Sequence, residues 1–327
     1  MYRYLFRRML NYLVLLFIAV SLAYLLAGSA LNPRTQFDWT NPNLNVASVE
    51  ALLTQYNINN KVPLLERYWT WLTNVVTHWD WGRTPKGEHV NQILATRIWV
   101  SVRLITIGSF VGILGGVALG AWTATRQHKM SDRTISILAL IVISTPMIVI
   151  ATVLQILATS FNHATGTQFF EFIGETGTIG AYPGAEIVNR LQHLLLPTIS
   201  MSLTGVATYS RYQRNLMLDT LGSDYVRTAR AKGLRKGAAV RKHALRTALV
   251  PMATYFAFVI AGLFTGATIT EQVYAWHGMG IYSVASITGH DINGTVAVVA
   301  FSAATTFAGL MLADIFTVVV DPRVRVS

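Results

Sequence analysis

Residues able to carry out catalysis are sparse in this 327-residue chain and follow no catalytic pattern. The sequence has no HExxH, GxSxG or GxxxxGK[ST] segment, which would indicate a zinc protease, a serine hydrolase or a nucleotide-binding loop. It has no cysteine, which excludes disulfides, thiolate metal ligands and a cysteine nucleophile. Its eight histidines are irregularly spaced, so we expect interfacial or solvated side chains instead of metal ligands. We therefore expect no enzyme, no metal site and no cofactor in this chain.

Two carboxylates lie in or beside apolar segments. Asp314 comes seven residues before Asp321, which corresponds to roughly 10 Å of helix. A charge at such a depth usually faces other helices and pairs with a polar group, so a structural partner is favoured over a substrate or proton contact. Glu271 lies at the end of another apolar segment, where a solvated or a gate-lining role is equally open.

A basic segment, GSDYVRTARAKGLRKGAAVRKHALRTALVP, lies between two apolar runs at residues 222–251. Asp224 and Gly233 are typical start and stop signals for a helix between them. Tyr225, Thr228 and Ala229 fall on one face with Lys232, and such a short helix needs a partner to be stable. Binding to anionic lipid is the alternative, but the small residues favour insertion into a protein groove.

The composition is typical of an integral membrane protein, with 52% hydrophobic and 13% charged residues. Six segments are mostly apolar and close to the roughly 17–25 residues that cross a bilayer as a helix. The least apolar of them is 194–210, because it contains Pro197 and several hydroxyl residues. These six expected crossings are 11–31, 100–123, 135–161, 194–210, 248–270 and 294–320.

The net charge of +11 could suggest nucleic acid, but the distribution of Lys and Arg argues against it. With both termini in the cytoplasm, the basic segments at 211–246 and 126–133 also lie inside, and the external segments are near neutral. Without the crossing at 194–210, the whole basic run would lie outside, against the positive-inside rule. We therefore expect six crossings in an all-α membrane protein of the cell's inner membrane, without a nucleic-acid partner.

The soluble part of the chain is expected at residues 32–97, as a small external helical insert. Helix-like spacing occurs in VASVEALLTQYNI and in PLLERYWTWLTNVV. Its five tryptophans fit an interfacial aromatic belt and a docking surface for an external partner equally well. The expected organisation is a first segment at 1–31, retained as an anchor rather than cleaved as a signal, then the insert at 32–97, and a core at 98–327 with a cytoplasmic loop at 218–246.

The motif DYVRTARAKGL followed by KHALRTALVP resembles the coupling loop of ATP-binding-cassette (ABC) importer permeases, in the form found in the dipeptide and oligopeptide subfamily. Further similarity covers nearly the full length: YLFRRMLNYLVLLF, DWGRT, STPMIVIATVLQIL, EQVYAWHGMGIYSVASITGHDINGTV and a final DPRVR. The long insert after the first segment resembles the first of the two permease subunits. The generic glutamate of the loop is replaced here by Arg227, which removes an acidic residue that would pair with the ATPase.

The resemblance implies a type I ABC importer permease that forms half of a translocation pathway for peptides. Its partners would be a second homologous permease subunit, two ATPase subunits or domains that bind ATP and Mg, and an external substrate-binding protein. Nickel, glutathione or haem are alternative cargoes, and a secondary transporter is less favoured because paired intramembrane charges are lacking. Contact with the ATPase is expected at Asp224, Tyr225, Arg227, Thr228, Ala229, Arg230, Lys232 and Gly233. For receptor docking we expect Trp79 and Trp81, within the insert, and the loop at 274–293.

Overall fold

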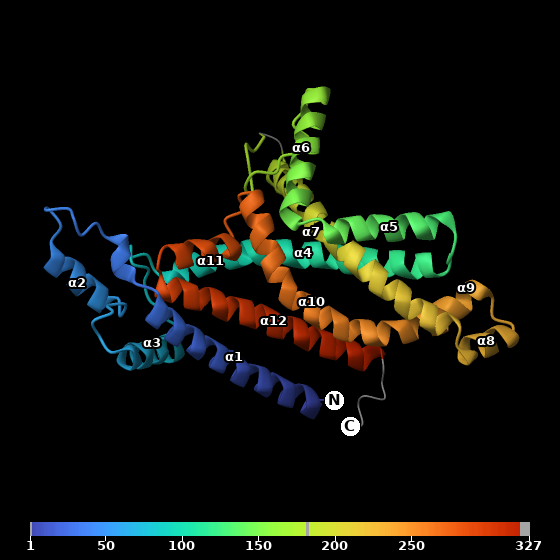
Figure 1. Cartoon of the computed structure of the whole chain (residues 1–327), viewed down its shortest axis with the longest axis horizontal. Coiled ribbons are helices and arrows are strands. Elements are labelled where there is room, and N and C mark those ends of the chain that lie inside the picture. Colours follow the sequence, from blue (N-terminus) through green and yellow to red (C-terminus); the bar gives the residue numbers. More distant parts are fainter. Residues whose placement is uncertain (1, 181–182, 321–327) are drawn as a thin grey trace. The chain divides into compact units, whose positions relative to one another are not determined.

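The computed structural model describes residues 2–180 and 183–320, and these residues form helices with no β-strand (Figure 1). The side chains of residues 2–4, 253–254, 257–266 and 317–320 are not described. The chain divides into two compact units, which are considered separately. The insert unit comprises Phe6–Val102 and His277–Phe307, and the core unit comprises Arg103–Trp276 with the described residues of Met1–Leu5 and Ala308–Ser327.

Three long helices, α1, α4 and α12, belong partly to each unit. The remaining elements of the insert unit lie before α4 and just before α12. In chain order the helices of this unit are α1 (Tyr2–Ala30), η1 (Pro33–Gln36), α2 (Val46–Gln55), α3 (Leu64–His78), α4 (Val90–Ala124), α11 (Met279–Thr288) and α12 (Ile292–Val320). The helices α2 and α3 confirm the two helical segments expected in the insert.

The core unit is organised around one long helix, α7, which contacts α5, α6 and α10. Its elements are α5 (Met130–Ser144), α6 (Met147–Thr165), α7 (Ala185–Leu221), α8 (Asp224–Ala231), α9 (Lys236–Ala239), η2 (Val240–Leu245) and α10 (Arg246–Val273).

Four helices within the described residues are long and apolar enough to cross a membrane: Leu5–Ala30, Val90–Ala124, Met147–Thr165 and Ile292–Phe316. The other expected crossings, 194–210 and 248–270, lie within α7 and α10, each of which has an internal proline. Six crossings therefore stay a prediction. The closing DPRVR motif, and the cytoplasmic C-terminus expected for it, fall outside the described residues.

The segment 135–161 is not the single helix expected from its hydropathy. It is divided between α5, which ends at Ser144, and α6, which begins at Met147. Thr145 is extended (φ −92°, ψ 126°) and Pro146 follows with φ −55° and ψ 140°. Proline has no N–H to continue a helix and disfavours helical geometry in the residue before it, so Pro146 accounts for this break.

In the insert unit, α3 packs against the second half of α1. The Tyr24 and Trp71 rings stack with centroids 4.7 Å apart, and the Tyr68 hydroxyl donates to the Ser21 hydroxyl at 2.8 Å. The Arg67 guanidinium is buried and donates to the Gly28 carbonyl at 3.2 Å. The expected "soluble" helix is thus attached along the first membrane segment.

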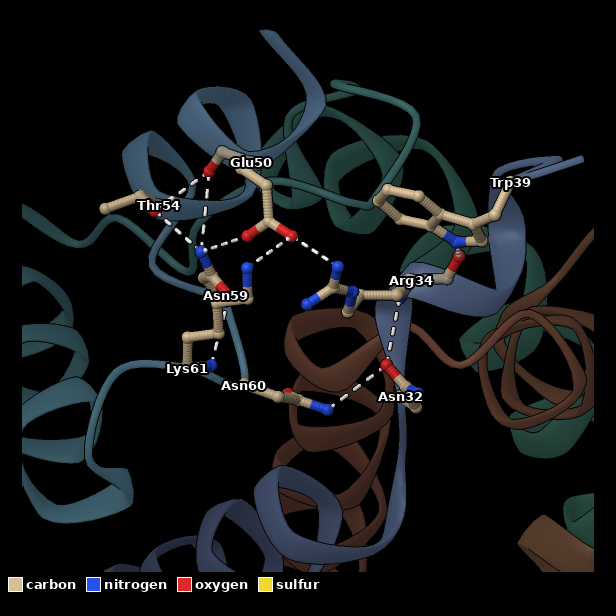
Figure 2. Close-up of polar contacts among 8 residues, drawn as sticks. All are labelled: Asn32, Arg34, Trp39, Glu50, Thr54, Asn59, Asn60 and Lys61. Atoms are coloured by element: carbon tan, nitrogen blue, oxygen red, sulfur yellow. Dashed lines mark hydrogen bonds and ion pairs between the residues drawn. The ribbon is translucent and has the colours of Figure 1, made fainter. Parts of the chain in front are cut away.

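A polar network holds the rest of the insert together (Figure 2). The Glu50 carboxylate forms ion pairs with Arg34 and with Lys61, the latter at 3.0 Å. The Asn59 amide donates to Glu50 Oε2 at 3.1 Å and to Thr54 Oγ1 at 2.8 Å. Lys61, and to a lesser extent Asn59 and Arg34, holds the pKa of Glu50 below its usual value, so this carboxylate is charged at neutral pH.

Glycines on α4 allow α7 to approach it closely in the core unit. A Cβ on Gly112 would lie 3.4 Å from the Gly205 Cα, and one on Gly120 would lie 3.0 Å from the Arg214 nitrogen. A Cβ on Gly116 would collide with Tyr209. These three glycines are spaced by four residues, so they form one face of α4. Small residues in such a row let two helix backbones meet within a membrane.

Candidate functional site

The basic loop of the core unit contains a short helix with defined ends. It is α8, Asp224–Ala231, preceded by Ser223 in an extended conformation (φ −72°, ψ 150°). The Gly233 N–H donates to the Arg230 carbonyl at 3.0 Å, and the Leu234 N–H donates to the Ala229 carbonyl at 3.2 Å. This pair of bonds is the Schellman motif, which needs a left-handed residue at Gly233; its φ is +89°. The expected start and stop residues are confirmed.

One face of α8 is packed against its own chain. Val226 and Ala229 are 4% and 7% exposed, and they join a cluster with Met217 of α7, Ala244 of η2 and Ala248 of α10. Most of these residues are alanines, so the backbones of the loop approach one another closely. The cluster seats α8 on the two long helices α7 and α10.

The opposite side of α8 is exposed and carries the remaining expected contact residues: Asp224, Tyr225, Arg227, Thr228, Arg230 and Lys232. Tyr225 is 43% exposed, although it is a large aromatic residue. Arg227 and Asp224 approach to 3.9 Å, but both are so exposed that this pair adds little stability. Ala229, which the helical spacing grouped with Tyr225 and Thr228, instead faces inward. It therefore positions the helix and leaves the outward contacts to the other residues.

An ion pair that sequence reasoning did not identify joins α5 to α7. The Arg214 guanidinium donates from Nε to Asp132 Oδ1 at 2.6 Å and from Nη2 to Oδ2 at 2.7 Å. The His128 N–H also donates to Asp132 Oδ2, at 3.2 Å. Arg214, through these hydrogen bonds, holds the pKa of Asp132 below its usual value. One signal was available: Asp132 is the single acid among the basic residues of segment 126–133.

In the insert unit, the DWGRT and HDINGT motifs lie together. The Asn293 amide donates to the Arg83 carbonyl at 2.9 Å, and a Cβ on Gly82 would lie 2.5 Å from the same amide nitrogen. Asp291 precedes α12 and accepts a hydrogen bond from the Gly294 N–H at 2.9 Å, so it caps that helix. The two motifs therefore contact each other at the start of α12.

The two tryptophans expected to dock a receptor have different surroundings. Trp81 is 8% exposed and packs edge-on to Trp71, with ring centroids 6.0 Å apart. Its burial leaves it almost no surface for a partner. Trp79 is 69% exposed, and it ends α3 in a left-handed conformation with φ 55°.

The two carboxylates singled out in the apolar segments are both in the core unit. Glu271 is fully buried near the end of α10, and Asp314 is half-buried on α12. Within the described residues, no group of three His, Asp or Glu side chains could hold a metal ion.

Comparison with known proteins decides the family. The family described as binding-protein-dependent transport system inner membrane component matches residues 116–326. The chain belongs to this family of transport permeases. It is 45% identical over 329 residues to the oligopeptide transport system permease protein OppB of Mycobacterium tuberculosis, with 100% of both chains covered. It is also 30% identical to the dipeptide transport system permease protein DppB of Lactococcus lactis, over 99% of this chain and 100% of that protein.

A third relative is the oligopeptide transport system permease protein AppB of Bacillus subtilis, 29% identical with 87% of each chain covered. The family, the relatives and the apolar helices agree on a multi-pass permease of an ABC importer in the inner membrane. The resemblance inferred from the coupling-loop motif is thereby confirmed.

Proposed function

We propose that this permease imports peptides and forms half of the translocation pathway of an ATP-driven importer. Support comes from relatives that match the whole chain and are named as oligopeptide or dipeptide transport permeases. Nickel, glutathione or haem remain alternative cargoes for the same architecture. The remaining components would be a second homologous permease subunit, two ATP-binding-cassette subunits that hold ATP and Mg, and an external substrate-binding protein.

The observation that carries the mechanism is the two-sided character of α8. Its inner face, Val226 and Ala229, is fixed to α7 and α10 through the alanine cluster, and its outer face is free of contacts with the cluster. We propose that the outer face lies in a groove of the ATPase subunit. Displacement of α8 when the ATPases close on ATP would then move α7 and α10 together, because the packed cluster joins all three.

The proposed orientation places α8 in the cytoplasm, with six crossings and both termini on that side. The charge distribution supports it, because the run from Arg211 to Arg246 is the most basic segment of the chain. The insert at 32–97 and the loop at 274–293 would then face the substrate-binding protein, and the core at 98–327 would form the pathway. Trp81 is buried, so it would not contact the substrate-binding protein directly.

The coupling role is tested by adding bulk to the exposed face of α8. Thr228→Trp should leave the permease folded, because Thr228 is exposed, but should abolish retention of the ATPase subunits and uptake in proteoliposomes. Thr125→Trp, an exposed threonine on another loop expected in the cytoplasm, is the matched control and should preserve both. Normal retention and uptake with Thr228→Trp would exclude α8 as the coupling element.

A further inference from the structure

The amphipathic helix α3 carries a row of large apolar side chains that are mostly exposed. Leu65, Trp69 and Val76 are 64%, 62% and 72% exposed. Their spacing of four and seven residues places them on one face of the helix. Trp79, directly after the helix, adds a fourth exposed apolar side chain. No acidic, lysine or arginine residue occurs from Tyr68 to Trp79.

The contacts of α3 with α1 show where this face lies along a membrane segment. Leu64 is against Gly28, Trp71 stacks on Tyr24, and Tyr68 bonds to Ser21. Ser21 is nine residues before Ala30, the end of the span Leu5–Ala30, which corresponds to roughly 14 Å along the helix axis. The middle of α3 is therefore level with the membrane segment, where an apolar surface meets lipid instead of water.

An apolar crevice of about 370 Å³ opens beside α3. It is lined by carbon from four helices, including Leu13 and Phe17 of α1, Val75 of α3, Leu94 of α4, and Ala300 and Phe301 of α12. Its one aliphatic hydroxyl, on Ser21, is already bonded to the Phe17 carbonyl at 2.7 Å and to Tyr68. The crevice offers no charge to a peptide or ion, and its volume exceeds that of a few water molecules.

Two hydrogen-bond donors beside the crevice lack an acceptor. The indole nitrogens of Trp71 and Trp81 have no hydrogen-bond partner within the described part of the chain, and both residues line the crevice. A buried indole N–H normally finds an acceptor. Both nitrogens are enclosed by protein atoms, so the crevice offers its ligand carbon contacts and not hydrogen bonds.

We propose that α3 is an interfacial membrane helix and that the crevice beside it binds an acyl chain of a bilayer lipid. The apolar row of α3 enters the leaflet nearest Ala30, with Trp69 and Trp79 at the level where tryptophan is commonly enriched. The acyl chain fills the space between α1, α3, α4 and α12. The insert is then fixed to the bilayer by lipid, and its polar network projects into water.

The position of α3 is tested with nitroxide labels in the assembled transporter in liposomes, since the chain has no cysteine of its own. A label at Val76→Cys should collide with oxygen, which dissolves in lipid, and be protected from a water-soluble nickel complex. Lys61→Cys, an exposed position of the same insert, is the matched control. A label there should collide readily with the nickel complex and less with oxygen. Equal nickel access at both sites, or protection of Val76 only when substrate-binding protein is added, would overturn the proposal in favour of water or a protein partner.

The crevice is tested by native mass spectrometry of the transporter purified from lipid. Wild type should retain lipid, Ala300→Trp should lose it by filling the crevice, and Ala303→Trp, on the same helix but outside the crevice lining, should retain it. Lipid retained equally by Ala300→Trp, or absent from wild type, would contradict the acyl-chain site. If Ala300→Trp does not fold, lipid retention by the wild type together with the nitroxide result decides.

Discussion

The Asp132–Arg214 ion pair makes the most quantitative prediction. In Arg214→Met, the Asp132 carboxylate, only 5% exposed, loses both of its side-chain hydrogen bonds and keeps one from the His128 backbone. Breaking a buried pair costs about 3–5 kcal/mol, and because Arg214 is itself 23% exposed, we expect about 2–3 kcal/mol. With an unfolding entropy of about 2.1 cal/mol/K per residue, the 327 residues of this chain correspond to a loss of roughly 3–4 °C in Tm.

Thermal unfolding of the purified permease at pH 7 measures this loss. Arg211→Met, an exposed arginine one turn earlier on α7, is the matched control and should change Tm little. Replacing both partners, as Asp132→Leu with Arg214→Met, should recover part of the loss because no unpaired charge remains. Since the folded pKa of Asp132 lies below 3.8, the stabilisation by the pair is present above about pH 4 and is lost as pH falls through the folded pKa. Equal Tm values for Arg214→Met and Arg211→Met would refute the reasoning.

Three further predictions follow from burial and charge. Ala229→Trp should lower Tm, because the cluster around Ala229 has no room for an indole, and an unchanged Tm would mean that the residue is not packed inward. Burial raises the pKa of Asp291 to about 6, so the stability of the fold should fall as pH rises from about 4 to about 6. Asp291→Asn, which keeps the helix cap, should remove this fall when Tm is measured across that pH range. An impermeant thiol reagent on intact cells should label Lys61→Cys and spare Arg227→Cys, both exposed positions, and the reverse pattern would invert the proposed topology.

The ends of α8 could be predicted from sequence because they depend on local chemistry. Asp224 and Gly233 act within a few residues of their own positions, and the structure places the helix between them. The face that Ala229 presents could not be predicted in the same way. Helical spacing groups residues correctly, but which group is buried depends on α7, η2 and α10, which lie elsewhere in the chain.

The break between α5 and α6 had a visible signal, Pro146, that a hydropathy average conceals. Such an average measures how apolar a segment is and does not register the missing N–H. Asp132 stood out as the single acid of a basic segment, but its partner could not be predicted, because 82 residues separate it from Arg214 and only the packing of α5 on α7 brings them together. The attachment of α3 to α1 could not be predicted either. A tryptophan-rich insert fits both water and a membrane surface, and its sequence does not distinguish the two.

The glycine row on α4 has a mechanical consequence for a transporter. Where α7 meets Gly112, Gly116 and Gly120, α4 presents backbone with no side chain to lock between ridges of its neighbour. A small axial shift of α7 therefore requires no rotamer change on α4, and the contact offers little resistance along the helix axis while still opposing separation. The contact therefore combines close packing of the two helices with freedom of α7 to shift along its axis. A methyl group added at Gly116 would collide with Tyr209 and hinder this shift of α7 at a point far from α8.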